Sequence, residues 1–270
     1  MTNDQRSATS DHLTIAGKTF TSRLFLGTGK YASPEDCIAA LDASGTQLVT
    51  VAIRRLDLDN PNARTELHYI DWERYNVLPN TAGCKTVEEA LFTARLGKEL
   101  TGSNWVKLEV IPDPKYLLPD PIGTLRAAEQ LITEGFVVLP YIHADPVLAK
   151  HLEEAGCATV MPLGSAIGSG QGILTLDEIK IIIENAKIPV VVDAGIGAPS
   201  DASLAMEIGA DCVLVNTAVA KAQDPALMAA AMRKAVEAGR EAYRAGRIPA
   251  QPYATASSPT AGVPELAKSS

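Results

Sequence analysis

The sequence predicts an α/β protein in which eight parallel strands close into a (β/α)8 barrel, the TIM-barrel fold. The chain has 270 residues, which is close to the length at which such a barrel forms one domain. Short segments rich in β-branched residues recur along it and are apolar throughout, as in parallel strands buried on both faces. Segments with helical periodicity follow most of them. An open doubly wound sheet is the weaker alternative, because no GxGxxG motif opens the first strand–helix turn.

Each predicted strand is a short apolar run, and each predicted helix follows one. The eight strands are expected at residues 24–26, 47–52, 77–79, 105–110, 136–140, 159–162, 189–193 and 212–216. The first helix begins at Ser33 and Pro34, a preferred arrangement of a capping residue followed by proline. Five further helices are expected at residues 86–100, 145–156, 175–186, 199–208 and 224–245.

Several segments lie outside the strand–helix repeat. Residues 13–20 are expected to form a small hairpin that closes the bottom of the barrel, so the barrel domain spans residues 13–247. Residues 1–12 and 248–270 are polar or rich in small side chains, and we expect a flexible N-terminus and a flexible C-terminal tail. Residues 53–75 are charged and long for a connection, which suits a lid or an oligomer contact.

Charge and composition exclude several classes of function. The net charge of −8 predicts a soluble protein and argues against nucleic acid or an anionic membrane as the partner. No apolar run is long enough to span a bilayer and the N-terminus lacks a signal-peptide core, so we expect a cytoplasmic protein. The four cysteines are far apart and are interpreted as packing residues. No histidine or cysteine spacing indicates a metal site.

Lys107 and Glu109 are the most unusual residues of the predicted strands, because they interrupt the apolar segment WVKLEVI. They are two positions apart and therefore point to the same side of a strand, together with Trp105. A barrel strand has no solvated face, so an exposed ion pair is the weaker interpretation. A buried lysine has a lowered pKa and can present a neutral amine to a carbonyl group, while the carboxylate moves protons.

Small residues follow the last three predicted strands, where the active site of a barrel enzyme lies. The three segments are LGSAIGSGQG (163–172), DAGIGAPSD (193–201) and VNTAVA (215–220). Small side chains let backbone N–H groups approach an anion, and the helix start behind them adds a favourable dipole. The sequence therefore predicts a phosphate site, with contacts from Gly168, Ala194, Gly195, Asn216 and Thr217.

Asp193 ends the seventh predicted strand directly before two of these contacts. It could cap the following turn or act as a second acid–base group at the mouth, and the sequence leaves both interpretations open. Tyr141 is interpreted as part of the wall rather than as an acid. Other residues at the mouth are expected to be Thr28, Lys30, Asn80 and Thr81, whereas turn geometry accounts for Gly170, Gly172 and Gly197.

These segments together resemble those of bacterial thiazole synthase, which builds the thiazole phosphate of thiamine. They are specific in combination, although each alone is a weak signal, and they run in order through residues 13–245. Ala166 stands where the family usually has proline and Ser203 where it usually has alanine, and neither is a proposed catalytic residue. The matching segments are GTGKY (27–31), VTVAIRR (49–55), LPNTAGC (78–84), WVKLEVI (105–111), LLPD (117–120), MPLGSAIGSGQG (161–172), VVDAGIGAPSDA (191–202) and VLVNTAVA (213–220).

The resemblance implies a (β/α)8 barrel that forms an imine between Lys107 and the ketone of 1-deoxy-D-xylulose 5-phosphate. It implies that sulfur comes from the C-terminal thiocarboxylate of a ubiquitin-like sulfur-carrier protein, and that dehydroglycine joins before the ring closes. A homotetramer, no metal or organic cofactor, and a second partner that supplies dehydroglycine are also implied. Glu109 and Asp193 match the acid–base carboxylates of the family. The matching phosphate or sugar contacts are Gly168, Ala194, Gly195, Asn216 and Thr217.

Two other functions remain open from the residues themselves. One is another Schiff-base barrel enzyme that acts on a sugar phosphate, such as an aldolase or the pyridoxal 5′-phosphate synthase barrel. It would cleave or convert the sugar without a sulfur donor. The other is a non-catalytic phosphate-binding barrel, which would keep the glycine segments but has no need of Lys107 beside Glu109.

Overall fold

The computed structural model describes residues 11–55 and 65–257, and the expected barrel lies within them. Its parallel strands form one sheet in the order β8-β7-β6-β5-β4-β3-β10-β9. Parallel bridges from Val160 to Val190 and from Leu163 to Asp193 join β8 to β9, so the sheet closes. The strands are β3 (Leu24–Gly27), β4 (Leu48–Ala52), β5 (Asn76–Asn80), β6 (Trp105–Leu108), β7 (Val137–Ile142), β8 (Met161–Pro162), β9 (Val191–Asp193) and β10 (Cys212–Val215).

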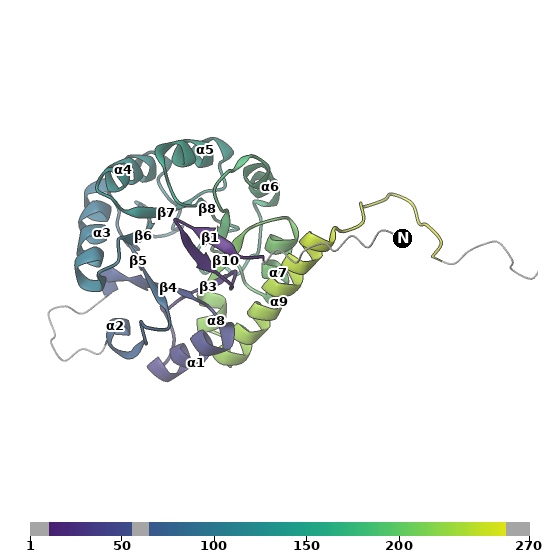
Figure 1. Cartoon of the computed structure of the whole chain (residues 1–270), viewed down its shortest axis with the longest axis horizontal. Coiled ribbons are helices and arrows are strands. Elements are labelled where there is room, and N and C mark those ends of the chain that lie inside the picture. Colours follow the sequence, from purple (N-terminus) through teal and green to yellow (C-terminus); the bar gives the residue numbers. More distant parts are fainter. Residues whose placement is uncertain (1–10, 56–64, 258–270) are drawn as a thin grey trace, which may run out of the picture.

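Helices form the outer ring of the barrel (Figure 1). Four of the described helices begin at a polar capping residue followed by proline, among them α1 after Ser33, α5 after Asp145 and α9 after Asp224. Asp120 starts α4 in the same way, although that helix was not expected from the sequence. The described helices are α1 (Pro34–Ser44), α2 (Glu66–Tyr69), α3 (Val87–Thr101), α4 (Pro121–Thr133), α5 (Pro146–Ala155), α6 (Leu176–Asn185), α7 (Pro199–Glu207), α8 (Thr217–Ala220) and α9 (Pro225–Ala245).

A separate antiparallel hairpin of β1 (Leu13–Ile15) and β2 (Lys18–Phe20) lies across the centre of the ring, as expected (Figure 1). Phe20 meets Phe25 of β3 and Trp105 of β6 edge to face, with ring centroids 5.7 and 6.1 Å apart. Trp105 begins its strand, so these contacts lie at the N-terminal end of the barrel. The hairpin therefore buries its apolar side against the barrel interior and closes that end.

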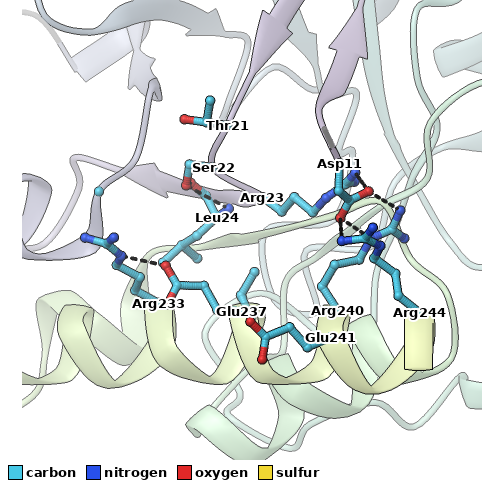
Figure 2. A pocket seen from close by; sticks show the side chains of 12 residues that line it. Asp11, Thr21, Ser22, Arg23, Leu24, Arg233, Glu237, Arg240, Glu241 and Arg244 are labelled. Atoms are coloured by element: carbon cyan, nitrogen blue, oxygen red, sulfur yellow. Dashed lines mark hydrogen bonds and ion pairs between the residues drawn. The ribbon is translucent and has the colours of Figure 1, made fainter. Parts of the chain in front are cut away.

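A charged cluster fixes the start of the hairpin to the last helix (Figure 2). The carboxylate of Asp11 accepts hydrogen bonds at 2.9 Å from Arg23 and, through both oxygens, from Arg240 of α9. Arg244 lies 4.0 Å away, and Arg23 also donates to the backbone oxygen of Asp211 at 2.7 Å. These side chains line a cavity of about 240 Å³ between α9 and the segment that leads into β3. We call these four residues (Asp11, Arg23, Arg240 and Arg244) the Asp11 cluster.

Parts of three predicted segments lie outside the described residues, namely 1–10, 56–64 and 258–270. The flexibility of the two termini and the lid or oligomer contact at residues 53–75 therefore stay predictions. Within the described part of that loop, Ile53–Arg55 forms one 3₁₀ turn and α2 follows. The described residues after α9 have no regular secondary structure up to residue 257. None of the described helices combines the length and apolar character that a membrane crossing requires.

Candidate active site

Lys107, Glu109 and Asp193 meet inside the C-terminal end of the barrel. The Nζ atom of Lys107 lies 2.5 Å from Oδ2 of Asp193 and 3.5 Å from Oε1 of Glu109. The three residues are only 6%, 5% and 3% exposed, respectively. Lys107 belongs to β6, Glu109 follows it, and Asp193 ends β9, so the alternation of side chains along each strand aims all three inward. We call these three residues the lysine–carboxylate trio. Buried charges of this kind persist only when they are paired.

The ionisation of Lys107 differs from the sequence-based expectation. Burial on its own lowers the pKa of the ammonium group, but the nearby carboxylates of Asp193 and Glu109 outweigh burial and raise the pKa above its ordinary value. The prediction of a lowered pKa was therefore wrong for the protein without substrate. It considered burial alone and gave the carboxylate of Glu109 only the role of moving protons, whereas the fold places two carboxylates beside Lys107. Lys107 is an ammonium group that must lose a proton before it can attack a carbonyl carbon.

Thr81 holds Glu109 in place. Its hydroxyl accepts a hydrogen bond from the Glu109 backbone N–H and donates one to the Glu109 backbone oxygen, both at 2.7 Å. Thr81 is fully buried, and its own N–H donates to the backbone oxygen of Lys107 at 3.2 Å. The Thr81 hydroxyl thus takes the place of backbone–backbone hydrogen bonds between β5 and β6 at the mouth. For this reason β6 ends at Leu108 rather than at the expected residue 110.

Tyr141 is fully buried beside the trio and packs with Ile111 and Leu163, and the expectation that it forms part of the wall stays a prediction. Its ring centroid lies 5.7 Å from Nζ of Lys107, close enough for a cation–π interaction. Its hydroxyl is buried and has no hydrogen-bond partner among the described residues. Burial raises the pKa of this hydroxyl, and the charges of Asp193 and Glu109 raise it further. The neutral phenol is therefore the form present beside the trio.

A cavity of about 390 Å³ opens above the lysine–carboxylate trio. All of the residues assigned to the site from sequence line it: Lys107, Glu109, Asp193, Gly168, Ala194, Gly195, Asn216 and Thr217. Their roles remain predictions, but the fold brings them to one cavity. An apolar side of the same cavity, formed by Ile111, Leu117 and Ile167 packed near Tyr141, was missed from the sequence. Its residues come from two irregular loops, which carry no periodic signal.

The small residues of the cavity are required by close packing. Ala194 and Gly195 both have left-handed backbone conformations, with φ angles of 69° and 79°. A Cβ atom on Gly195 would lie 2.0 Å from the hydroxyl of Ser165, so no side chain fits there. Gly197 also differs from its expected role in a turn, because a Cβ atom there would lie 2.5 Å from the backbone oxygen of Gly170. Close approach of two loops, rather than turn geometry, explains that glycine.

Asn216 and Thr217 stand at the start of α8, beside the segment that follows β3. The side-chain oxygen of Asn216 is buried and has no hydrogen-bond partner among the described residues, so it can accept a hydrogen bond from a bound hydroxyl group. The hydroxyl of Thr217 accepts a hydrogen bond from Nζ of Lys30 at 3.2 Å. Asn80 and Thr28 also line the cavity at the mouth, as expected. Thr81 differs from the expectation, because it is fully buried behind the residues that line the cavity.

None of the four cysteines lines this cavity. All four are buried with free thiols, as expected of packing residues. Burial raises the pKa of Cys84, which follows β5 near the mouth, so its thiol stays protonated. Within residues 11–55 and 65–257, no three side chains of histidine, cysteine, aspartate or glutamate are grouped to hold a metal ion.

The fold and the site define a (β/α)8-barrel enzyme with a lysine–carboxylate centre and a cradle of small residues in one cavity. Comparison with known proteins makes the assignment specific. The sequence profile of the family "Thiazole biosynthesis protein ThiG" matches residues 14–259. The thiazole synthase of Acaryochloris marina is 60% identical over 262 residues, which cover 95% of this chain and 95% of that protein. The chain therefore belongs to the ThiG family of thiazole synthases.

Two further relatives show how the domain occurs elsewhere. The "Bifunctional protein ThiO/ThiG" of a Nostoc strain is 63% identical over 256 residues, which cover 93% of this chain but only 39% of that protein. This chain thus spans about two fifths of the bifunctional relative. Among solved structures, the BexX/CysO complex of Amycolatopsis orientalis contains a similar chain with a TM-score of 0.80 and 36% identity. That match covers 88% of this chain and 98% of the other.

Proposed function

We propose that this chain builds a thiazole phosphate from 1-deoxy-D-xylulose 5-phosphate, dehydroglycine and sulfur, through an imine between Lys107 and the ketone of the sugar. The proposal depends on one observation: a buried lysine contacts two carboxylates inside a cavity that is also lined by small residues such as Gly168, Ala194 and Gly195. Membership of a thiazole synthase family supports the reaction. A non-catalytic phosphate-binding barrel would gain nothing from three buried charges, which are costly to keep out of water.

Asp193 is the proposed acceptor of the first proton. The ammonium group of Lys107 transfers a proton across the 2.5 Å contact to the Asp193 carboxylate, and the neutral amine adds to the ketone carbon. The new hydroxyl group takes a proton from the trio and leaves as water, which completes the imine. This route keeps a nucleophile available although the pKa of Lys107 is raised, because the proton only moves within the trio.

Glu109 is proposed to move the next proton. The imine makes the neighbouring C–H bond of the sugar acidic, so a carboxylate can remove that proton and return it at another atom, which shifts the carbonyl group along the chain. Glu109 lies 3.5 Å from Nζ, where it can reach atoms next to the imine nitrogen. The apolar side chains of Ile111, Leu117 and Ile167 limit water near the imine, which would otherwise hydrolyse it early.

Related proteins support two proposed protein partners, one that carries sulfur and one that supplies dehydroglycine. We propose that sulfur arrives as the C-terminal thiocarboxylate of a small ubiquitin-like carrier protein, since a 36% identical chain is found in a complex with CysO. The fusion named ThiO/ThiG supports a second partner, an enzyme that supplies dehydroglycine. A homotetramer in the cytoplasm remains part of the proposal. We assign no cofactor to this chain, because the trio supplies the nucleophile and both proton carriers.

Reconstitution tests this function. Purified chain, 1-deoxy-D-xylulose 5-phosphate, dehydroglycine and thiocarboxylated carrier protein should together yield a thiazole phosphate, detected by mass spectrometry. Carrier protein with an ordinary carboxylate is the matched control and should yield none. Cleavage of the sugar phosphate in the absence of carrier and dehydroglycine would instead identify an aldolase-type enzyme and refute the proposal.

A further inference from the structure

We propose that Lys30 is the cationic group that binds the substrate phosphate, an inference that rests on the proposed function of the same cavity. Lys30 follows β3 in the segment GTGK and lines the cavity beside α8. From sequence it was expected only to line the mouth. The geometry gives its ammonium group a defined position there.

The ammonium group of Lys30 lies between two of the predicted phosphate contacts. Its Nζ atom donates a hydrogen bond to the hydroxyl of Thr217 at 3.2 Å. A Cβ atom placed on Gly168 would lie 3.2 Å from the same Nζ atom, so the lysine passes directly over that glycine. A phosphate held by the backbone at Gly168 and Thr217 is therefore within reach of a direct contact with Lys30.

The backbone of Lys30 supports a role for its side chain. Its φ angle of 74° lies in the left-handed region, which favours glycine and is uncommon for lysine. Strained backbone of this kind clusters at ligand sites, where the surrounding structure maintains it. The conformation aims the side chain across the mouth toward α8, where its contact with Thr217 is found.

The positions of the charged side chains in the cavity favour binding of the phosphate beside Lys30. The described lining residues include two lysines, Lys30 and Lys107, and two carboxylates. Lys107 contacts both carboxylates, so its charge is engaged at the reacting end. A phosphate monoester carries between one and two negative charges at neutral pH, and backbone N–H groups offer only partial positive charge. Lys30 adds a full charge, which directs the phosphate toward β3 and α8 and the ketone toward β6.

The test compares two sugars on two variants of Lys30 and one control variant. Lys30→Met removes the charge and keeps the length of the side chain, and Lys30→Arg keeps the charge. Lys150→Met is the matched control, because Lys150 is an exposed lysine of α5. Borohydride trapping at Lys107 is measured against the concentration of 1-deoxy-D-xylulose 5-phosphate and of unphosphorylated 1-deoxy-D-xylulose.

We expect Lys30→Met to raise the half-saturating concentration of the phosphorylated sugar about ten- to hundredfold, the usual effect of losing a charge-assisted hydrogen bond. The unphosphorylated sugar should be trapped equally well by Lys30→Met and the unmodified protein. Lys30→Arg should retain most of the preference for phosphate, and Lys150→Met should behave as the unmodified protein. An equal loss with both sugars, or no loss with the phosphorylated one, would overturn the inference.

A second arm separates failure of this inference from failure of the proposed function. Binding of inorganic phosphate, measured by calorimetry, requires no imine. The unmodified protein should bind phosphate at least tenfold more tightly than Lys30→Met. Equal binding, or no binding by either, would refute the role of Lys30. If no sugar adduct forms at Lys107 in the unmodified protein, the proposed function fails, and the phosphate arm still decides the question for Lys30.

Discussion

Nζ of Lys107 and Oδ2 of Asp193 lie 2.5 Å apart, although one belongs to β6 and the other ends β9. Closure of the barrel brings these two strand ends across one interior. The contact does two things that neither residue does alone. It raises the pKa of Lys107, and in the proposed mechanism Asp193 accepts the proton that Lys107 loses before it attacks the carbonyl carbon.

The ionisation of Lys107 should depend more on Asp193 than on Glu109. Asp193→Asn removes the nearer carboxylate, so the pKa of Lys107 should fall clearly below that of the unmodified protein. Glu109→Gln removes the carboxylate at 3.5 Å and should lower the pKa less. ¹⁵N NMR of the lysine side chain across a pH titration measures both. A larger decrease in the pKa of Lys107 in Glu109→Gln would show that Glu109, and not Asp193, has the larger effect on that pKa.

The raised pKa of Lys107 also predicts how the stability of the protein depends on pH. The folded protein binds this proton more tightly than the unfolded chain. Its contribution to stability is therefore complete below the ordinary pKa of about 10.5 and is lost as the pH rises through the folded value. Asp193→Asn should reduce this alkaline loss, measured as the difference in urea midpoint between pH 9 and pH 11. An undiminished loss would assign the alkaline transition to other groups.

Loss of Lys107 itself should stop turnover without removing the phosphate site. Lys107→Ala should reduce the rate of thiazole formation below detection, whereas the affinity for inorganic phosphate should change less than threefold. Lys107→Arg is the control for charge, because arginine keeps the carboxylates paired but forms no imine. Turnover by Lys107→Arg would contradict the covalent mechanism, and an unfolded arginine variant would show that the lysine is needed for the fold.

The sequence predicted the barrel well because its strands are apolar runs of a recognisable length. It missed α2 and α8, which have four residues each and too little length for a periodic pattern. It also missed α4, although that helix has 13 residues and begins with Asp120 and a proline. The contacts within the site were harder to predict, because they form only when the sheet closes into a barrel. Lys30 and Thr217 are 187 positions apart, and no local pattern relates them. The pKa of Lys107 was misjudged for the same reason, because Asp193 becomes its neighbour only in the folded barrel.

Thr81 should matter for both stability and rate. Thr81→Val keeps the shape but leaves the buried backbone N–H and oxygen of Glu109 without their hydroxyl partner, at a cost of about 1–3 kcal/mol. Loss of this partner should shift the Glu109 carboxylate and slow thiazole formation about tenfold or more. Urea unfolding and the rate of thiazole formation measure these effects. Thr81→Ser retains the hydroxyl and should behave nearly as the unmodified protein; equal defects in both variants would point to packing instead.

The Asp11 cluster should stabilise the protein above moderately acidic pH. Hydrogen bonds from Arg240 and the charge of Arg23 lower the pKa of Asp11 to about 2, against burial, which acts in the opposite direction. The stability it confers is therefore complete above the ordinary value of 3.8 and is lost as the pH falls toward 2. Asp11→Asn should cost about 1–2 kcal/mol at pH 7, allowing for partial solvent screening, and much less at pH 3.

Asp177 provides the control for this effect. Its carboxylate is 87% exposed and pairs with Lys180 one turn along α6. Asp177→Asn should change the free energy of unfolding by less than about 0.5 kcal/mol at either pH. Urea unfolding at pH 7 and pH 3 measures both variants. A cost in Asp11→Asn that does not depend on pH would mean that the cluster acts through packing rather than through charge.

Borohydride reduction in the presence of 1-deoxy-D-xylulose 5-phosphate tests the central claim most directly. Peptide mass spectrometry should find the mass of the reduced sugar phosphate on the peptide that contains Lys107, and on no peptide of the Lys107→Arg variant. The adduct should disappear when borohydride or the sugar is omitted. An adduct on another lysine, or none at all while the protein still makes thiazole phosphate, would contradict the account of Lys107 as the group that forms the imine.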